Sequence, residues 1–219
     1  MRSNTYRLTA EALLECRNMN LPASLVLLPL LALSLPVSAG EPSADRGAHL
    51  YAQCASCHGA DGGGTADGSV PRIAGQLESV VRKQLGDFRA GRRSDFRMTE
   101  FADRHHLGTA QDLADLAAYV SRLQATGARG IGDGSRATAG ALLFGARCAS
   151  CHGADGRGNA AKAVPRLAGQ HYSYLVRQMY DAVDGRRQTL PRLHANRIES
   201  LDFAQVRGIA DYLSRIEPR

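Results

Sequence analysis

The sequence predicts an all-α protein made of two tandem copies of one small domain. Three observations support this prediction: an internal repeat, apolar residues at helical spacing, and the lack of strand-like alternation. Apolar residues recur three and four positions apart over residues 77–88, 113–123 and 206–216. The last two segments are preceded by capping boxes, Thr109-x-x-Asp112 and Asp202-x-x-Gln205, which predict where each helix begins.

The internal repeat has a period of 94 residues. CASCHGADG at 54–62 recurs unchanged at 148–156, PRIAGQ at 71–76 recurs as PRLAGQ at 165–170, and GRR at 91–93 recurs at 185–187. Two copies with so long a period indicate a duplicated domain rather than a solenoid. We therefore expect a first domain over residues 40–124, a Gly-rich linker over 125–134 and a second domain over 135–219.

Residues 1–39 are predicted to be a signal peptide. The segment 21–37 is apolar and uncharged, and Ser38 and Ala39 follow it as the small residues that precede a cleavage site. Met19 is an alternative start of the chain. This apolar segment is shorter than the about 20 residues that a spanning helix needs. We therefore expect membrane contact only if the leader is retained as an anchor. The prediction is an exported, periplasmic protein.

The charge pattern argues against nucleic-acid binding. The formal net charge is +6, but the 27 Lys and Arg residues are spread along the chain in runs no longer than two. No stretch interleaves basic and aromatic residues in the way that base stacking requires.

A helical unit of about 85 residues buries little surface by itself, so a large apolar group is expected to fill the core of each repeat.

Four of the five cysteines form two CxxCH motifs. In such a motif two thiols add to the two vinyl groups of one haem, and the histidine ligates the iron. A zinc site would need both CxxC pairs within a short stretch, a thioredoxin motif would need a βαβ context, and disulfides would leave the following histidines unexplained. We therefore predict two haem c groups, tethered by Cys54 and Cys57 with His58 as ligand, and by Cys148 and Cys151 with His152.

The repeated elements resemble the dihaem class I cytochromes c of the cytochrome c4 type, over residues 44 to 217. The resemblance implies two tandem class I cytochrome c domains, each wrapping one covalently bound haem, with the haems coupled across the domain interface. It also implies that the backbone carbonyls of Pro71 and Pro165 accept the Nδ1 protons of His58 and His152. Such bonds orient the ring and raise the basicity of the ligand.

The sixth iron ligands are expected to differ between the repeats. Met98 lies 40 residues after His58, where the family places its axial methionine, so it is the predicted ligand of the first haem. In the second repeat Arg192 occupies the corresponding position, and no methionine follows Met179. The predicted ligand there is His194, placed in a loop, with an open or water-bound iron and some other ligand as alternatives.

Met179 and His171 are two further residues whose side chains could bind the second iron. Met179 falls on the apolar face of a predicted helix and is expected to lie in the core. His171 competes with His194 by chemistry, but it directly follows the PRLAGQ element, where resembling proteins often carry a histidine that binds no iron.

The predicted function is outer-sphere electron transfer by an electron carrier that is not an enzyme. Its partners would be redox proteins, either an oxidase or a reductase or dehydrogenase. One alternative is a haem subunit that stays docked to a dehydrogenase. Another is a sensor or peroxidatic protein that uses the second haem, since that haem lacks a methionine ligand.

Overall fold

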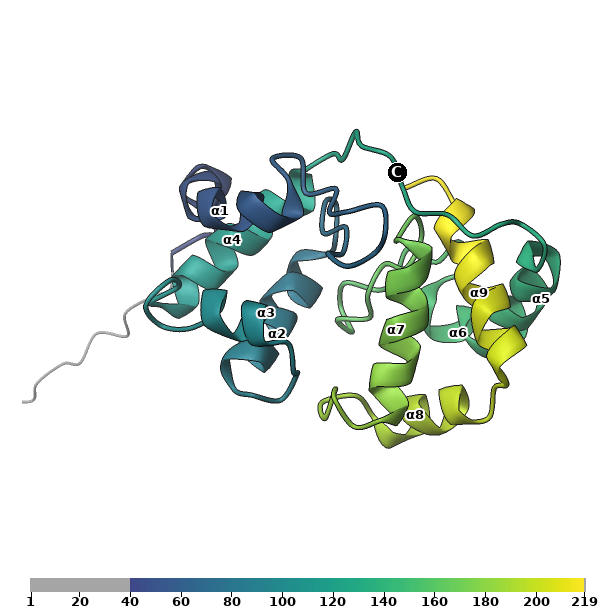
Figure 1. The fold of residues 1–219 in the computed structure, drawn as a ribbon. Helices are drawn as coiled ribbons and strands as arrows, with labels where there is room; N and C mark the ends of the chain where they lie inside the picture. The colour runs from purple at the N-terminus through teal and green to yellow at the C-terminus, as the bar shows by residue number, and fades with distance from the viewer. Residues whose placement is uncertain (1–39, 219) are drawn as a thin grey trace, which may run out of the picture. The chain divides into compact units, whose positions relative to one another are not determined.

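The computed structural model describes residues 40–218, and the predicted signal peptide lies outside this range. The described chain contains nine helices and two isolated β-bridges (Figure 1). The first repeat contains α1 (Ala44–His58), α2 (Glu78–Arg89), α3 (Phe96–Phe101) and α4 (Ala110–Arg122). The second contains α5 (Ala137–Arg147), α6 (Ala149–His152), α7 (Tyr172–Val183), α8 (Arg192–Glu199) and α9 (Phe203–Arg215). Between residues 40 and 218, no helix is both long and apolar enough to span a bilayer.

The predicted all-α class is confirmed, and the helices expected from periodicity correspond to α2, α4 and α9. Both capping boxes form: Thr109 and Asp112 exchange hydrogen bonds at the start of α4, and Asp202 and Gln205 do so at the start of α9. The predicted loop around His194 is wrong, because this residue lies in helix α8. Eight residues are too few to reveal a helical period. The exact bounds of the two domains and the linker stay a prediction.

Each repeat is built around a close crossing of its first and last long helices, α1 on α4 and α5 on α9 (Figure 1). Glycines make these crossings. A Cβ atom on Gly47 would overlap the carbonyl group of Asp115, and one on Gly140 would overlap the carbonyl group of Gly208. Apolar side chains then close two separate cores, one in each repeat.

The two repeats hold each other through the same element. The side-chain amide of Gln76 accepts from the Arg166 N–H group and donates to its carbonyl, both at 3.0 Å. Reciprocally, the amide of Gln170 accepts from the Arg72 N–H group at 3.0 Å and donates to its carbonyl at 2.7 Å. The repeated PR-x-AGQ sequence therefore forms a symmetric clamp between the two copies.

The two GRR elements also pair with each other. They meet in an antiparallel bridge between Arg93 and Arg187. Backbone hydrogen bonds flank it, from Ser94 N–H to the Arg186 carbonyl at 3.0 Å and from Gln188 N–H to the Arg92 carbonyl at 2.9 Å. The PR-x-AGQ and GRR elements thus both contribute to the contact between the repeats.

Replacing Gly140 with Ala is expected to lower the free energy of unfolding by about 1–3 kcal/mol, because the methyl group overpacks the crossing of α5 and α9. The matched control is Gly145→Ala on the same helix, where nothing lies within 4 Å of the added Cβ. Alanine should raise the stability there by up to about 1 kcal/mol through its helix propensity. Denaturant unfolding of the holoprotein measures both, and equal stabilities of the two variants would contradict the close crossing.

Candidate haem centres

Each CxxCH motif ends a helix with a buried histidine. His58 is the last residue of α1 and His152 the last of α6, and their exposed fractions are 5% and 7%. The Nδ1 atoms of the two rings lie 3.0 Å from the carbonyl oxygens of Pro71 and Pro165, respectively. A carbonyl only accepts, so Nδ1 carries the proton and the lone pair of Nε2 is left for a metal ion. Burial lowers the pKa of both rings and favours this neutral form.

None of the four cysteines of the motifs forms a disulfide, and each motif places two of them just before its histidine. Cys54 and Cys148 are half-buried and pack against the apolar core of their repeat, whereas Cys57 and Cys151 are exposed. Burial raises the pKa of the Cys54 thiol to about 11. Each pair therefore places one thiol at the core and one at the surface.

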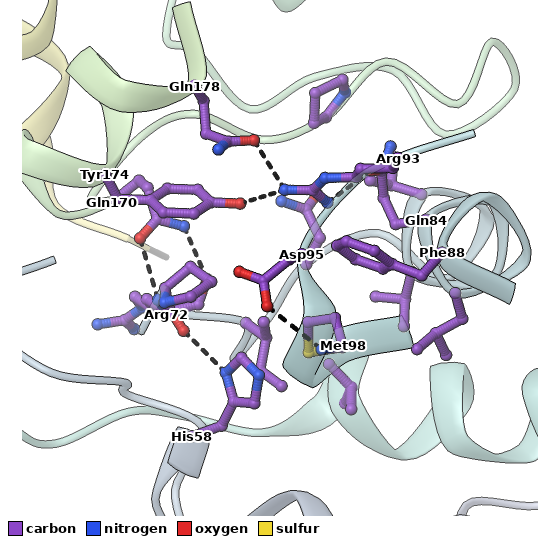
Figure 2. Close-up of a pocket in the computed structure, with 18 of the residues that line it drawn as sticks. His58, Arg72, Gln84, Phe88, Arg93, Asp95, Met98, Gln170, Tyr174 and Gln178 are labelled. Carbon is purple, nitrogen blue, oxygen red and sulfur yellow. Dashed lines mark hydrogen bonds between the residues drawn. The ribbon is translucent and has the colours of Figure 1, made fainter. Parts of the chain in front are cut away.

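A cavity of about 480 Å³ adjoins His58 in the first repeat. Met98 and His58 are both among its lining side chains (Figure 2). Asp95 caps the short helix α3 by accepting hydrogen bonds from the N–H groups of Arg97 and Met98, and this cap places Met98 at the cavity. In the first repeat, the apolar part of the wall comes from Ile73, Val80, Val81, Leu85, Phe88, Leu116 and Val120.

The residues around this cavity fit a haem. A haem is a largely apolar disc whose iron takes axial ligands and whose propionates need cationic donors. The apolar wall suits the disc, and His58 and Met98 supply nitrogen and sulfur. Arg72 also lines the cavity, and its Nε atom is buried without a hydrogen-bond partner. A buried donor of this kind is costly unless an anion pairs with it, and a propionate would do so.

The second repeat closes one side of the first cavity. Arg93 donates to the Gln84 side chain at 2.6 Å and, across the interface, to the Tyr174 hydroxyl at 2.6 Å and the Gln178 side chain at 2.7 Å (Figure 2). Arg187 lies nearby, and burial, followed by the charge of Arg93, lowers its pKa to about 10. No carboxylate of residues 40–218 forms an ion pair with either guanidinium. Sequence reasoning missed this cluster, although the repeated GRR element pointed to both arginines.

In the second repeat, His194 faces the proximal histidine. The ring centroids of His152 and His194 are 6.1 Å apart. A metal–imidazole bond is about 2.0–2.1 Å long, so two imidazoles on one ion bring their ring centres to about 6 Å. The Nδ1 atom of His194 is buried without a hydrogen-bond partner. Burial, followed by the neighbouring His152, lowers the pKa of His194 to about 4, so the ring is neutral at pH 7.

Met179 and His171, the other candidate ligands of the second iron, make different contacts. Met179 lies on α7 and packs against the second core, as its place on an apolar face predicted. Both nitrogens of His171 are engaged: Nδ1 accepts from the Gly130 N–H group at 3.0 Å, and Nε2 donates to the Gly63 carbonyl at 2.8 Å. His171 therefore has no lone pair left for iron.

Two tandem helical domains, each with a proline-anchored CxxCH histidine, define a c-type cytochrome with two haem domains. The family model for cytochrome c matches residues 44–124 and 137–217. The chain belongs to the cytochrome c4 family of dihaem cytochromes c. It therefore carries two haems, one at Cys54 and Cys57 and one at Cys148 and Cys151, and it is an electron carrier rather than an enzyme.

Three relatives illustrate this membership. Cytochrome c4 of Azotobacter vinelandii is 36% identical over 186 residues, which cover 77% of this chain and 85% of the relative. The structure of reduced recombinant cytochrome c4 from Pseudomonas stutzeri has a TM-score of 0.72 at 30% identity, covering 80% of this chain and all of that one. A thiosulfate dehydrogenase electron acceptor of Stutzerimonas stutzeri is 33% identical over 173 residues, covering 74% of this chain and 78% of the relative.

Proposed function

We propose that this protein carries single electrons by outer-sphere transfer between redox proteins of the periplasm. The observation that carries the proposal is the presence of two proline-anchored histidines in one pair of clamped repeats. The two haems supply one-electron chemistry at their irons. The side chains around them hold, orient and tune these groups, and no nucleophile or general base of a catalytic site is needed.

The iron ligands that we propose are His58 and Met98 in the first repeat and His152 and His194 in the second. Met98 is supported by its place on the wall that also holds His58. His194 is supported by its ring distance from His152 and its unpartnered nitrogen. The carbonyls of Pro71 and Pro165 would raise the basicity of the proximal rings by accepting their Nδ1 protons.

This ligand set makes the two centres unequal. A thioether favours reduced iron, whereas an imidazole is the better donor to oxidised iron. The first haem would therefore have the higher potential, and an electron that enters at the second haem would move toward the first. His194 as a ligand would leave no open coordination position on the second iron, which disfavours the sensor and peroxidatic alternatives.

A haem subunit docked to a dehydrogenase is the second candidate function. The relative named as an electron acceptor of thiosulfate dehydrogenase favours it. Purification from the native organism distinguishes the two: a free carrier elutes as a monomer, and a docked subunit co-elutes with a larger catalytic chain.

Replacing Met98 with Ala is expected to lower the upper of two one-electron steps by a sizeable part of the roughly 0.8 V range that axial ligands span. The lower step should stay nearly unchanged, because its haem has other ligands. A redox titration followed by absorbance measures both. Met179→Ala is the matched control, since it removes the other methionine of residues 40–218 from the second core. Two equal potentials with methionine-type spectra would refute the proposed ligand set.

His194→Ala should convert one of the two haems from low spin to high spin and let its reduced form bind carbon monoxide. The reason is that an open position replaces the second imidazole. The number of carbon monoxide molecules bound per protein, measured by titration, should rise from zero to one. His105→Ala, which removes an exposed histidine, should leave the spectrum unchanged. If the unmutated protein already has one high-spin haem that His194→Ala does not alter, His194 is not a ligand.

A further inference from the structure

His171 joins three segments of the chain although it binds no iron. The residue is 1% exposed and lies at the start of α7. Its Nε2–H group donates to the Gly63 carbonyl of the first repeat, and its Nδ1 atom accepts from the N–H group of Gly130, which lies between the repeats. A carbonyl only accepts and an amide N–H only donates, so these partners select the neutral ring with the proton on Nε2.

The backbone at this position does not require a histidine. The equivalent residue of the first repeat is Leu77, the cap of α2, and it has nearly the same backbone angles, φ −62° and ψ 135° against φ −59° and ψ 133° for His171. An apolar side chain therefore fits this cap. The two hydrogen bonds are what distinguishes His171 from its counterpart.

The segments that His171 joins are themselves tied to functional parts. Gly63 lies in the loop that follows His58, and the next residue, Gly64, donates its N–H group to the His58 carbonyl at 2.8 Å. The Gly130 carbonyl accepts from the Tyr172 N–H group at 2.7 Å, at the first residue of α7. The imidazole thus connects the loop behind the first iron ligand with the connecting segment and with the second repeat.

We propose that neutral His171 is a positioning residue for electron transfer between the two haems, because it holds the His58 loop and the connecting segment against the second repeat. The proposal rests on the proposed two-haem function. Protonation of Nδ1 would remove the acceptor for the Gly130 N–H group and place a second donor against it. In acid, the connecting segment would then lose its hydrogen bond to His171 of the second repeat.

The surroundings of His171 oppose protonation. Burial has the largest effect on its pKa and lowers it below the ordinary value of 6.5; Arg72 and Arg129 also lower it, while the Gly63 hydrogen bond and Asp67 raise it. The folded-state pKa is therefore below that of the unfolded chain. The neutral contact is complete above the ordinary histidine range and is lost only as the pH falls through the lowered pKa.

The test measures the rate of electron transfer between the haems after photoreduction, from about pH 8 to about pH 4, in the holoprotein and two variants. The unmutated protein should slow about fivefold to tenfold in acid, as expected for one lost hydrogen bond. His171→Gln keeps an acceptor and a donor but cannot titrate, so it should stay fast throughout. His171→Leu, which copies Leu77, should be slow at every pH. An acid slowing in His171→Gln equal to that of the unmutated protein would overturn the proposal.

Hydrogen exchange of the Gly130 amide gives a readout that does not depend on electron transfer. At neutral pH it should be about fivefold to tenfold faster in His171→Leu than in the unmutated protein, and nearly unchanged in His171→Gln. His105→Leu is the surface control. If the haems exchange no electrons in any variant, the proposed function fails while the exchange data still report the contact. If His171→Leu leaves Gly130 exchange unchanged, the His171 proposal fails by itself.

Discussion

The hydrogen bond from each proximal histidine to a proline carbonyl is the contact on which the rest of the structure depends. It joins the end of the CxxCH helix to the PR-x-AGQ element and fixes which ring nitrogen faces the iron. The same element then supplies Arg72, which lines the first cavity, and Gln76, which grips the backbone of the other repeat. One short stretch therefore orients the ligand, meets the haem and joins the domains.

Because both copies contain this element, the interface is nearly symmetric even though the chain is one molecule. Gln76 and Gln170 make equivalent clamps, and the GRR elements pair in an antiparallel bridge. The symmetry brings Arg93 and Arg187 together without a carboxylate from residues 40–218 to pair with them. The haem propionates are the natural counter-charges for such a cluster, so loading of the haems and closure of the interface should support each other.

On this shared scaffold the two repeats differ at a few positions that carry the chemistry. The proposed ligands Met98 and His194 lie on the corresponding short helices α3 and α8 but carry sulfur and nitrogen. Leu77 and His171 are the equivalent N-caps of α2 and α7, but only the histidine forms a hydrogen bond to Gly63 of the other repeat. With the proposed ligands, the difference between the haems and the contact between the repeats both arise at a few positions of a duplicated domain.

The sequence by itself determined the all-α class, the duplication, the two haem attachment sites and the capping boxes, because each depends on local spacing or on identity between repeats. It also singled out His194, as the remaining ligand type near the missing methionine. Only the tertiary structure decided that His194 faces His152, that α8 is a helix, and that the glutamines and His171 join the repeats. These contacts link residues far apart in the chain, and their geometry follows from packing, which no local pattern encodes.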